Sequence, residues 1–411
     1  MSSNYGPQED RPASRRTTQV SGERELRRDP ANARRLGLGV ALLVLAVLIV
    51  VVFVLRIPSD VSVTFRLNAQ PALKIPDIHL PVFATNLILG ILTAALGAAQ
   101  IFWRKNRHPY MFFTVGLVFF AIAFISWAGK AQSVDFEGLL MTTLIQAVPL
   151  TLGALAGLLC ERSGVINIAI EGQFLVAAFF GAMIGSVTHM LWLGLLSGAV
   201  AGGLLGVLLA IFTITYMADQ IIVGVVLDAF ALGLTTFFTQ SLLVPNQATL
   251  NSPAVFSPVS LPILSKIPII GPLLFNQNII VYLTILILIA VQLGLFHTRW
   301  GLRVRAVGEN PKAAETVGID VRRVRYRNVI LGGIVAGIGG ASFTIGSTGQ
   351  FAVNMTSGLG YIALAAMIFG RWRPFGALGA ALLFGFADGL QFTLSVLNVP
   401  IPSDVLSMFP Y

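Results

Sequence analysis

The sequence is short of charge, of cysteine and of paired histidines. Only 11% of its 411 residues are Asp, Glu, Lys or Arg, whereas a soluble globular protein carries roughly 25%. So few charges cannot cover the surface of a soluble protein of this length, but they suit a chain whose outer surface faces lipid. The single cysteine, Cys160, excludes an internal disulfide framework and a cysteine-based zinc site. The four histidines are scattered and offer no metal-ligand pair.

Sequence motifs of catalysis are also absent. No G-x-x-x-x-G-K-[ST] loop occurs, so the chain has no nucleotide-binding loop of its own. Neither H-E-x-x-H nor G-x-S-x-G appears, and no nucleophile and base converge in a recognisable pattern. We therefore predict no catalytic residues, no metal site and no cofactor bound by this chain.

What the sequence has instead is a series of long apolar runs. The first, Leu36 to Leu55, holds twenty residues without a charge, and at 1.5 Å per residue it is about 30 Å long, the thickness of a bilayer core. The pattern predicts an all-α polytopic membrane protein with about eleven transmembrane helices. The other predicted spans are 82–103, 111–129, 138–160, 165–187, 190–214, 220–244, 279–297, 328–347, a shorter one at 359–370, and 374–398.

The basic residues predict the orientation of these spans. With the N-terminus in the cytoplasm, 22 of the 27 Lys and Arg fall on the inner side, as the positive-inside rule requires. The formal charge of +9 is thus a topology signal and does not point to nucleic acid. The polar, basic residues 1–35 are expected to form a disordered cytoplasmic tail. The predicted inner segments are 1–35, 104–110, 161–164, 215–219, 298–327 and 371–373.

Glycines recur every four residues in several spans. In the span 190–214 they stand at Gly194, Gly198, Gly202 and Gly206, on one helical face. Small residues at this spacing let two helix backbones approach closely in lipid. The spacing predicts a compact helical bundle.

Three carboxylates fall within predicted spans, where a charge is costly and usually faces a cavity, a pathway or a partner. Glu171 has Asn167 four residues before it, on the same face of the predicted helix. Asp388 is likewise followed on one face by Gln391. A purely structural role, in which each carboxylate is protonated or satisfies a helix break, is equally compatible with the sequence. The predicted substrate-pathway residues are Asn167, Glu171, Gln173, Gln220, Asp228, Asp388 and Gln391.

The inner loop 298–327 contains a predicted short helix. Asn310 followed by Pro311 is a typical helix start, and Gly318 is a plausible stop. A short capped helix between two spans has the right shape to dock into a groove of a soluble partner. A basic loop that only holds the topology would not need the capped helix. The predicted partner-contacting residues are Glu309, Asn310, Pro311, Ala313, Ala314, Glu315 and Gly318.

Four segments carry a family resemblance: ERSGVINIAIEG at 161–172, RAVGENPKAAETVGI at 305–319, GYIALAAMIFGRW at 360–372 and GFADGLQ at 385–391. They resemble the permease subunits of bacterial ABC importers. The resemblance is to the branch that serves nucleosides and simple sugars, which is related to branched-chain amino-acid and ribose permeases, and it covers about residues 138–398.

The resemblance implies a transport subunit, not an enzyme, in a bacterial plasma membrane. It implies three partners: a second, similar permease; a cytoplasmic ABC ATPase that binds ATP and Mg; and an extracytoplasmic substrate-binding lipoprotein. The helix at 309–319 would couple the ATPase to the bundle, and the segment with Asn167 and Glu171 would line the translocation route. The expected substrate is a nucleoside.

The resemblance also divides the chain. Residues 36–129 would be accessory transmembrane helices, 130–398 the core permease bundle, and 399–411 a short extracytoplasmic end. Members of this family usually continue with one more span, so we expect the chain to be truncated relative to them. Asp228 stands where close relatives would carry Asn.

Two alternatives remain open at this point. The first is an ABC permease for a simple sugar or a branched-chain amino acid, because a route with a few amides, carboxylates and aromatics suits these substrates too. The second is a proton-coupled secondary transporter in which Glu171, Asp228 and Asp388 relay protons.

Overall fold

A computed structural model describes residues 30–58, 60–67, 76–103, 109–267 and 270–397, together with 399 and 408. Ten helices in this described part are long and apolar enough to cross a membrane. An eleventh apolar helix, α14 (Leu359–Phe369), has only 11 residues. The chain is an all-α polytopic membrane protein, as its apolar runs predicted. Residues 1–29 of the expected tail lie outside the described residues. Most of the expected extracytoplasmic end, 399–411, also lies outside them.

The chain forms two compact units. Unit 1 comprises Met1–Thr64 and His79–Ser133, and unit 2 comprises Phe65–Ile78 and Val134–Tyr411. Each unit is described separately below.

Unit 1 is a bundle of three transmembrane helices. The first begins at Pro30, six residues earlier than expected, so residues 30–35 are helical. Helices α1 and α2 pack closely where a Cβ on Gly39 would lie 3.2 Å from the carbonyl oxygen of Gly97. Three short strands stand where the chain passes from one unit to the other, and their order is β2-β1-β3. The elements are α1 (Pro30–Leu48), η1 (Ile49–Val54), β1 (Ser62–Arg66), β2 (Ile78–Pro81), α2 (Val82–Phe102), α3 (Pro109–Ala128) and β3 (Ser133–Asp135).

Unit 2 contains the remaining spans. Its helices α4, α5 and α13 are buried over most of their length and form the centre of the bundle, whereas no more than 33% of the apolar window is buried in the spans of α7, α10 and α15. The elements are α4 (Phe136–Glu161), α5 (Ile170–Thr188), α6 (Leu191–Ala210), η2 (Ile211–Thr215), α7 (Gln220–Phe238), η3 (Thr239–Leu243), α8 (Gln247–Leu250), β4 (Pro258–Ser260), η4 (Leu264–Lys266), α9 (Ile270–Phe275), β5 (Asn276–Asn278), α10 (Ile279–His297), α11 (Arg299–Glu309), α12 (Pro311–Thr316), α13 (Val321–Phe343), η5 (Thr344–Thr348), α14 and α15 (Pro374–Val396).

The glycines of α6 pack against those of α13, as the four-residue spacing predicted. A Cβ on Gly202 would lie 2.4 Å from the carbonyl oxygen of Gly333 and 2.6 Å from the Cα of Gly337. No other residue fits at this crossing, so the two helices touch through their backbones.

Two helix boundaries differ from the expected ones. Helix α5 begins at Ile170, five residues late, because the chain turns at Gly164 (φ +83°) and runs without helical structure to residue 168. Helix α13 begins at Val321, seven residues early, because the Asp320 side chain accepts a hydrogen bond from the backbone N–H of Arg323 and caps it.

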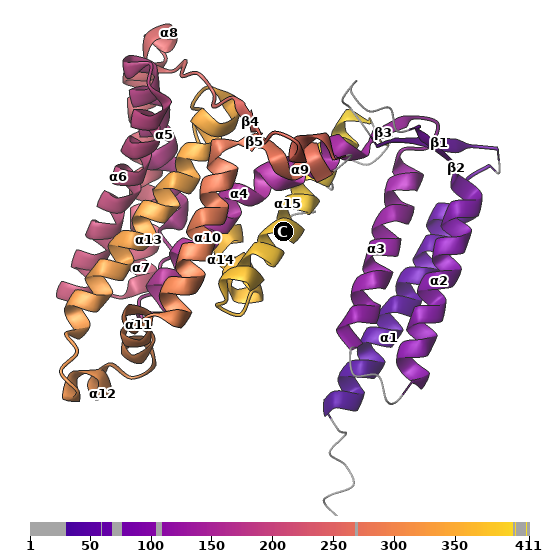
Figure 1. Ribbon diagram of the computed structural model, residues 1–411, viewed down its shortest axis with the longest axis horizontal. Helices are drawn as coiled ribbons and strands as arrows, with labels where there is room; N and C mark the ends of the chain where they lie inside the picture. The colour runs from indigo at the N-terminus through magenta and orange to yellow at the C-terminus, as the bar shows by residue number, and fades with distance from the viewer. Residues whose placement is uncertain are drawn as a thin grey trace, which may run out of the picture. The chain divides into compact units, whose positions relative to one another are not determined.

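The two ends of unit 2 are built differently. Helices α11 and α12 lie at one end of the bundle, and the antiparallel strands β4 and β5 lie at the other (Figure 1). Helices α10 and α13 run between these ends, since α11 and α12 connect them along the chain. A site near the start of α10 and the end of α13 therefore lies far from α12.

Candidate functional site

A polar cleft of about 470 Å³ opens in unit 2 among α4, η5 and α15. Its α4 and α15 walls are held together closely, because a Cβ on Gly385 would lie 2.7 Å from the carbonyl oxygen of Thr143. The cleft belongs to the end of the bundle opposite α11 and α12. It is lined by Thr142, Ile145, Gln146, Ser347, Asp388, Gln391, Phe392 and Ser395.

Two of the predicted pathway residues, Asp388 and Gln391, line this cleft. The Nε2 atom of Gln146 donates a short hydrogen bond to the Asp388 carboxylate. This bond orients the carboxylate and leaves acceptor capacity for a ligand, because an ionised carboxylate has about four lone-pair sites. Gln146 was not predicted. Its sequence signal was weak: it stands four residues after Thr142 on one face of α4.

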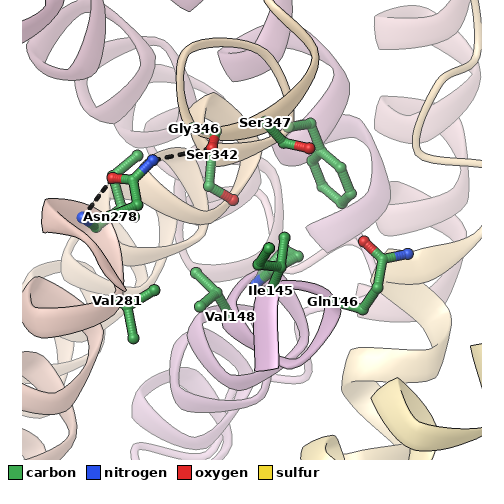
Figure 2. A pocket seen from close by; sticks show the side chains of 11 residues that line it. Ile145, Gln146, Val148, Asn278, Val281, Ser342, Gly346 and Ser347 are labelled. Carbon is green, nitrogen blue, oxygen red and sulfur yellow. Dashed lines mark hydrogen bonds between the residues drawn. The ribbon is translucent and has the colours of Figure 1, made fainter. Parts of the chain in front are cut away.

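A smaller pocket of about 30 Å³ adjoins the cleft and shares Ile145, Gln146 and Ser347 with it. Figure 2 shows Asn278 at its rim, where Nδ2 donates to the carbonyl of Gly346 (2.9 Å) and Oδ1 accepts from the N–H of Ile280 (3.0 Å). Asn278 thus caps α10 and ties it to η5.

Both walls of the smaller pocket interrupt regular helix. Pro149 lies inside α4 and has no N–H, so the carbonyl of Ile145, four residues earlier, has no helical donor. Opposite it, η5 is a π-helical turn that ends at Gly349 (φ +69°). π-helical turns inside helices are frequent at functional sites. Both irregular segments contribute lining residues to this pocket.

The cleft is chemically suited to a small uncharged molecule. It offers one carboxylate, two carboxamides and three hydroxyls, which can bind hydroxyl and amide groups. Phe392, with 62% of its surface exposed, adds a flat apolar face. A strongly charged ligand would leave most of these groups without a complementary partner.

The predicted residue Glu171 lies elsewhere, packed against the start of α14. Its Oε1 accepts hydrogen bonds from the hydroxyl of Thr356 (2.5 Å) and the N–H of Gly358 (2.8 Å), and Oε2 accepts one from the N–H of Gly360 (2.7 Å). The side chain is 5% exposed. Glu171 therefore satisfies the free N–H groups at the N-terminus of a buried short helix, where a negative charge is also favoured by the helix dipole.

Asp228 does the same for α5. Its Oδ1 accepts from the N–H of Gly172 (2.7 Å), in the first turn of α5, and its Oδ2 accepts from the hydroxyl of Tyr361 (2.8 Å). A Cβ on Gly172 would lie 2.9 Å from that Oδ1 and 3.1 Å from the Cα of Asp228, so glycine is required there. Asp228 and Glu171 thus each bind the start of a helix.

The expected pairing of Asn167 with Glu171 on one helical face is wrong, because α5 begins only at Ile170. Asn167 is fully buried, and its Nδ2 donates to Oε1 of Gln173 at 3.2 Å. Gln220 accepts a hydrogen bond from the N–H of Ile166 (2.7 Å) and so holds the non-helical stretch before α5. The side chains of Asn167, Gln173 and Gln220 do not line the cleft.

The predicted coupling helix is present as α12. Asn310 caps it, with Oδ1 accepting from the N–H of Ala313 (3.1 Å), Pro311 is its first residue, and Gly318 follows it with φ +80°. Glu309, Ala313 and Glu315 are exposed beside them. The longer helix α11 before it was missed, because its arginines suggested a basic loop. Its apolar positions Val304 and Val307 are buried at helical spacing.

Ala314 is placed differently from the other predicted contact residues. It is 3% exposed and packs with Val307 and Val321 in a small apolar cluster. Ala314 therefore supports the segment from within and is not available to a partner. The exposed apolar residues here are Leu302 (62%) and Val317 (74%), which were not predicted.

Helix α11 contacts the turn that joins α4 and α5. A Cβ on Gly308 would lie 2.4 Å from the carbonyl oxygen of Arg162. The Arg162 guanidinium donates to the carbonyl of Trp372 (2.8 Å), and Trp372 Nε1 donates to the Glu161 carboxylate (2.5 Å). Burial lowers the pKa of Arg162, while the charge of Glu309 acts in the opposite direction. Helix α11 is therefore in direct contact with the turn that follows α4.

Comparison with known proteins identifies related sequences over unit 2. A family model described as the branched-chain amino acid transport system / permease component matches residues 139–409. The guanosine ABC transporter permease protein NupQ of Bacillus subtilis (strain 168) is 40% identical over 283 residues, covering 66% of this chain and 87% of NupQ. The nucleoside ABC transporter permease protein NupC of Lactococcus lactis is 39% identical over 281 residues, covering 65% and 87%.

The putative glucose ABC transporter permease protein TsgC13 of Haloferax volcanii is 35% identical over 264 residues, covering 64% of this chain and 80% of TsgC13. The same two bacteria hold a second matching permease each, NupP (29% identical) and NupB (27% identical). No solved structure matches the chain.

Proposed function

The chain belongs to the permease-component family of branched-chain amino acid transport systems, and from this membership we propose that it is the transmembrane subunit of an ABC importer for nucleosides. The observation that carries the substrate assignment is the cleft formed by Gln146, Asp388, Gln391 and Phe392. Its lining residues fall within residues 139–409, which the permease family model matches, and guanosine and nucleoside permeases are among the relatives.

A nucleoside matches this cleft group by group. Its ribose hydroxyls are donors for the Asp388 carboxylate, which Gln146 already orients. Its base has a flat face for Phe392 and edge groups for the carboxamide of Gln391. Glucose, the substrate named for one relative, would use the hydroxyl-binding groups and leave Phe392 without a flat partner.

In the proposed orientation, the N-terminus and the α11–α12 segment are cytoplasmic, and the cleft opens to the outer side of a bacterial plasma membrane. The positive-inside distribution of Lys and Arg supports this orientation. An extracytoplasmic lipoprotein delivers the substrate to the cleft. A cytoplasmic ATPase, which binds ATP and Mg, docks on the exposed residues of α11 and α12.

A second permease subunit completes the translocation path in this proposal. The two matching permeases in each of the two bacteria support such a pair. Of the three carboxylates within spans, Glu171 and Asp228 hold the starts of α14 and α5, and Asp388 is the one that contacts substrate.

A proton relay is less compatible with these contacts. Glu171 and Asp228 bind backbone N–H groups of helices, while Asp388 pairs with Gln146. Nucleoside uptake that requires the ATPase and is stopped by vanadate supports the proposal. Uptake that survives loss of the ATPase and collapses with a protonophore contradicts it.

The site itself is tested by Asp388→Asn in proteoliposomes that contain the complete transporter. Loss of one charge-assisted hydrogen bond should raise the KM for nucleoside about tenfold. The exposed Asp77 does not line the cleft and supplies a matched control, because Asp77→Asn removes the same charge. An unchanged KM in Asp388→Asn would remove the cleft from the substrate path.

A further inference from the structure

Unit 1 contains a cavity of about 530 Å³ at the end of the bundle where α1 begins and α2 ends. It is lined by Asn32, Arg35 and Leu36 from α1, and by Ile101 and Phe102 from α2. It lies outside the region matched by the permease family. The transport site in unit 2 therefore does not account for this cavity.

Arg35 lines this cavity, and part of its guanidinium has no hydrogen-bond partner. Its Nε and Nη1 atoms are shielded from solvent, and they find no hydrogen-bond acceptor within the described part of the chain. A buried charged donor without a partner is costly. The neighbouring Arg34 is different, since its Nη1 donates to the hydroxyl of Tyr110 at 3.1 Å.

The helices of unit 1 cannot supply an anion for Arg35. No Asp or Glu occurs in α1, α2 or α3. Gly39, one turn after Arg35 on the same face of α1, packs against Ile101 and Gly97, so α1 and α2 are in close contact there. The guanidinium is thus held between two helices, in a cavity with room for a ligand.

The surroundings place this cavity at a membrane–water interface. The apolar run of α1 begins directly after Arg35, at Leu36. The same end of the unit carries Trp103 and Tyr110, which are 59% and 51% exposed, and such residues gather at the level of lipid headgroups. Phe102, which lines the cavity, is 82% exposed and offers apolar surface to an acyl chain.

We propose that this cavity binds the phosphate group of an anionic phospholipid, with the Arg35 guanidinium on the phosphate oxygens and Phe102 and Leu36 against the acyl chains. A guanidinium presents a planar fork of N–H donors that matches two phosphate oxygens. The lipid supplies an anion for the Arg35 side chain that lines the cavity, and apolar groups that suit Leu36 and Phe102 in its wall. Unit 1 is then a lipid-binding module attached to the permease core.

The test measures lipid binding to the purified full chain by native mass spectrometry. The probe is dioleoyl phosphatidylglycerol, and dioleoylglycerol is the matched lipid without phosphate. Arg35→Gln should weaken phosphatidylglycerol binding about tenfold and leave dioleoylglycerol binding unchanged. Arg35→Lys, which keeps the charge and loses the fork, should lie between the wild type and Arg35→Gln.

Arg56, exposed at the other end of α1, supplies the control for general charge. If Arg56→Gln and Arg35→Gln weaken phosphatidylglycerol binding equally, the site does not exist. If inorganic phosphate alone binds the wild type and displaces the lipid, the site serves a soluble phosphate and the lipid assignment is overturned. Size-exclusion profiles of Arg35→Lys and Arg35→Gln confirm that the compared proteins are folded.

Discussion

The carboxylate of Glu171 accepts a hydrogen bond from the backbone N–H of Gly360, 2.7 Å away, across 189 residues of sequence. Helix α14 has 11 residues and is about 16 Å long, so it cannot cross a bilayer on its own. Its first N–H groups must find acceptors inside the protein, because lipid offers none. Glu171, in the first turn of α5, accepts hydrogen bonds from the N–H groups of Gly358 and Gly360. Asp228 in turn accepts one from the N–H of Gly172, at the start of α5.

Glu171→Ala should destabilise the protein. The hydroxyl of Thr356 and the N–H groups of Gly358 and Gly360 would lose their acceptor, and we expect the free energy of unfolding to fall by about 3 kcal/mol. Thermal unfolding of the purified protein measures this loss, and Glu171→Gln, which keeps one acceptor, should lose less. Normal stability with abolished uptake would instead show that the carboxylate contacts the substrate.

Gly360→Ala should displace α14. A Cβ at this position would lie 2.5 Å from both the N and the Cα atoms of Glu171, which are backbone atoms and cannot turn aside. We expect little folded protein in the membrane fraction. Gly379 on α15 has open space around it, so Gly379→Ala is the matched control and should accumulate normally. Equal accumulation of both variants would contradict the close packing of α14 on α5.

Phe392→Leu should weaken the transport of nucleosides more than the transport of free sugars. Stacking of a base on an aromatic ring contributes about 1–3 kcal/mol, so we expect the KM for nucleoside to rise about tenfold, while any uptake of free ribose changes little. Phe375, also exposed on α15 but outside the cleft, provides the control Phe375→Leu. Equal effects on nucleoside and ribose would show that no base lies against this ring.

Val317→Asp should reduce coupling without unfolding the chain. Val317 is 74% exposed beside α12, and a charge there would disturb an apolar contact with the ATPase. We expect loss of substrate-stimulated ATP hydrolysis and of uptake. Ala314→Leu should act differently, because overpacking its buried cluster costs about 1–3 kcal/mol of stability. Normal coupling in Val317→Asp would move the docking surface away from α12.

The sequence predicted the spans and the short capped helix after Asn310 well, and the coupling role of this helix stays a prediction. A long apolar run predicts a membrane helix from its length alone. The predicted span 279–297 has the same bounds as α10. The Asn310 cap and the stop at Gly318 are local effects within a few residues, which a sequence shows directly. The family resemblance was confirmed by the matching model and relatives.

The site was predicted only in part, because it depends on contacts between distant helices. Gln146 and Ser347 face the cleft through the packing of α4 against α15 and the π-helical turn of η5, and neither effect has a local sequence signal. Glu171 was singled out correctly as unusual. Its partners, however, come from residues 356–360, so the sequence could not distinguish a helix cap from a substrate contact.

Helix α13 and the π-helical turn η5 form one span that runs from the α12 segment to the cleft. The span Val321–Thr348 has 28 residues, about 42 Å of continuous helix, and it packs through glycine backbones on α6. Val321 touches the cluster under α12 at one end, while Ser347 lines the cleft at the other. In the proposed transporter, we expect this span to carry a displacement at α12 to Ser347, with the π-helical turn η5 as the place where the helix bends.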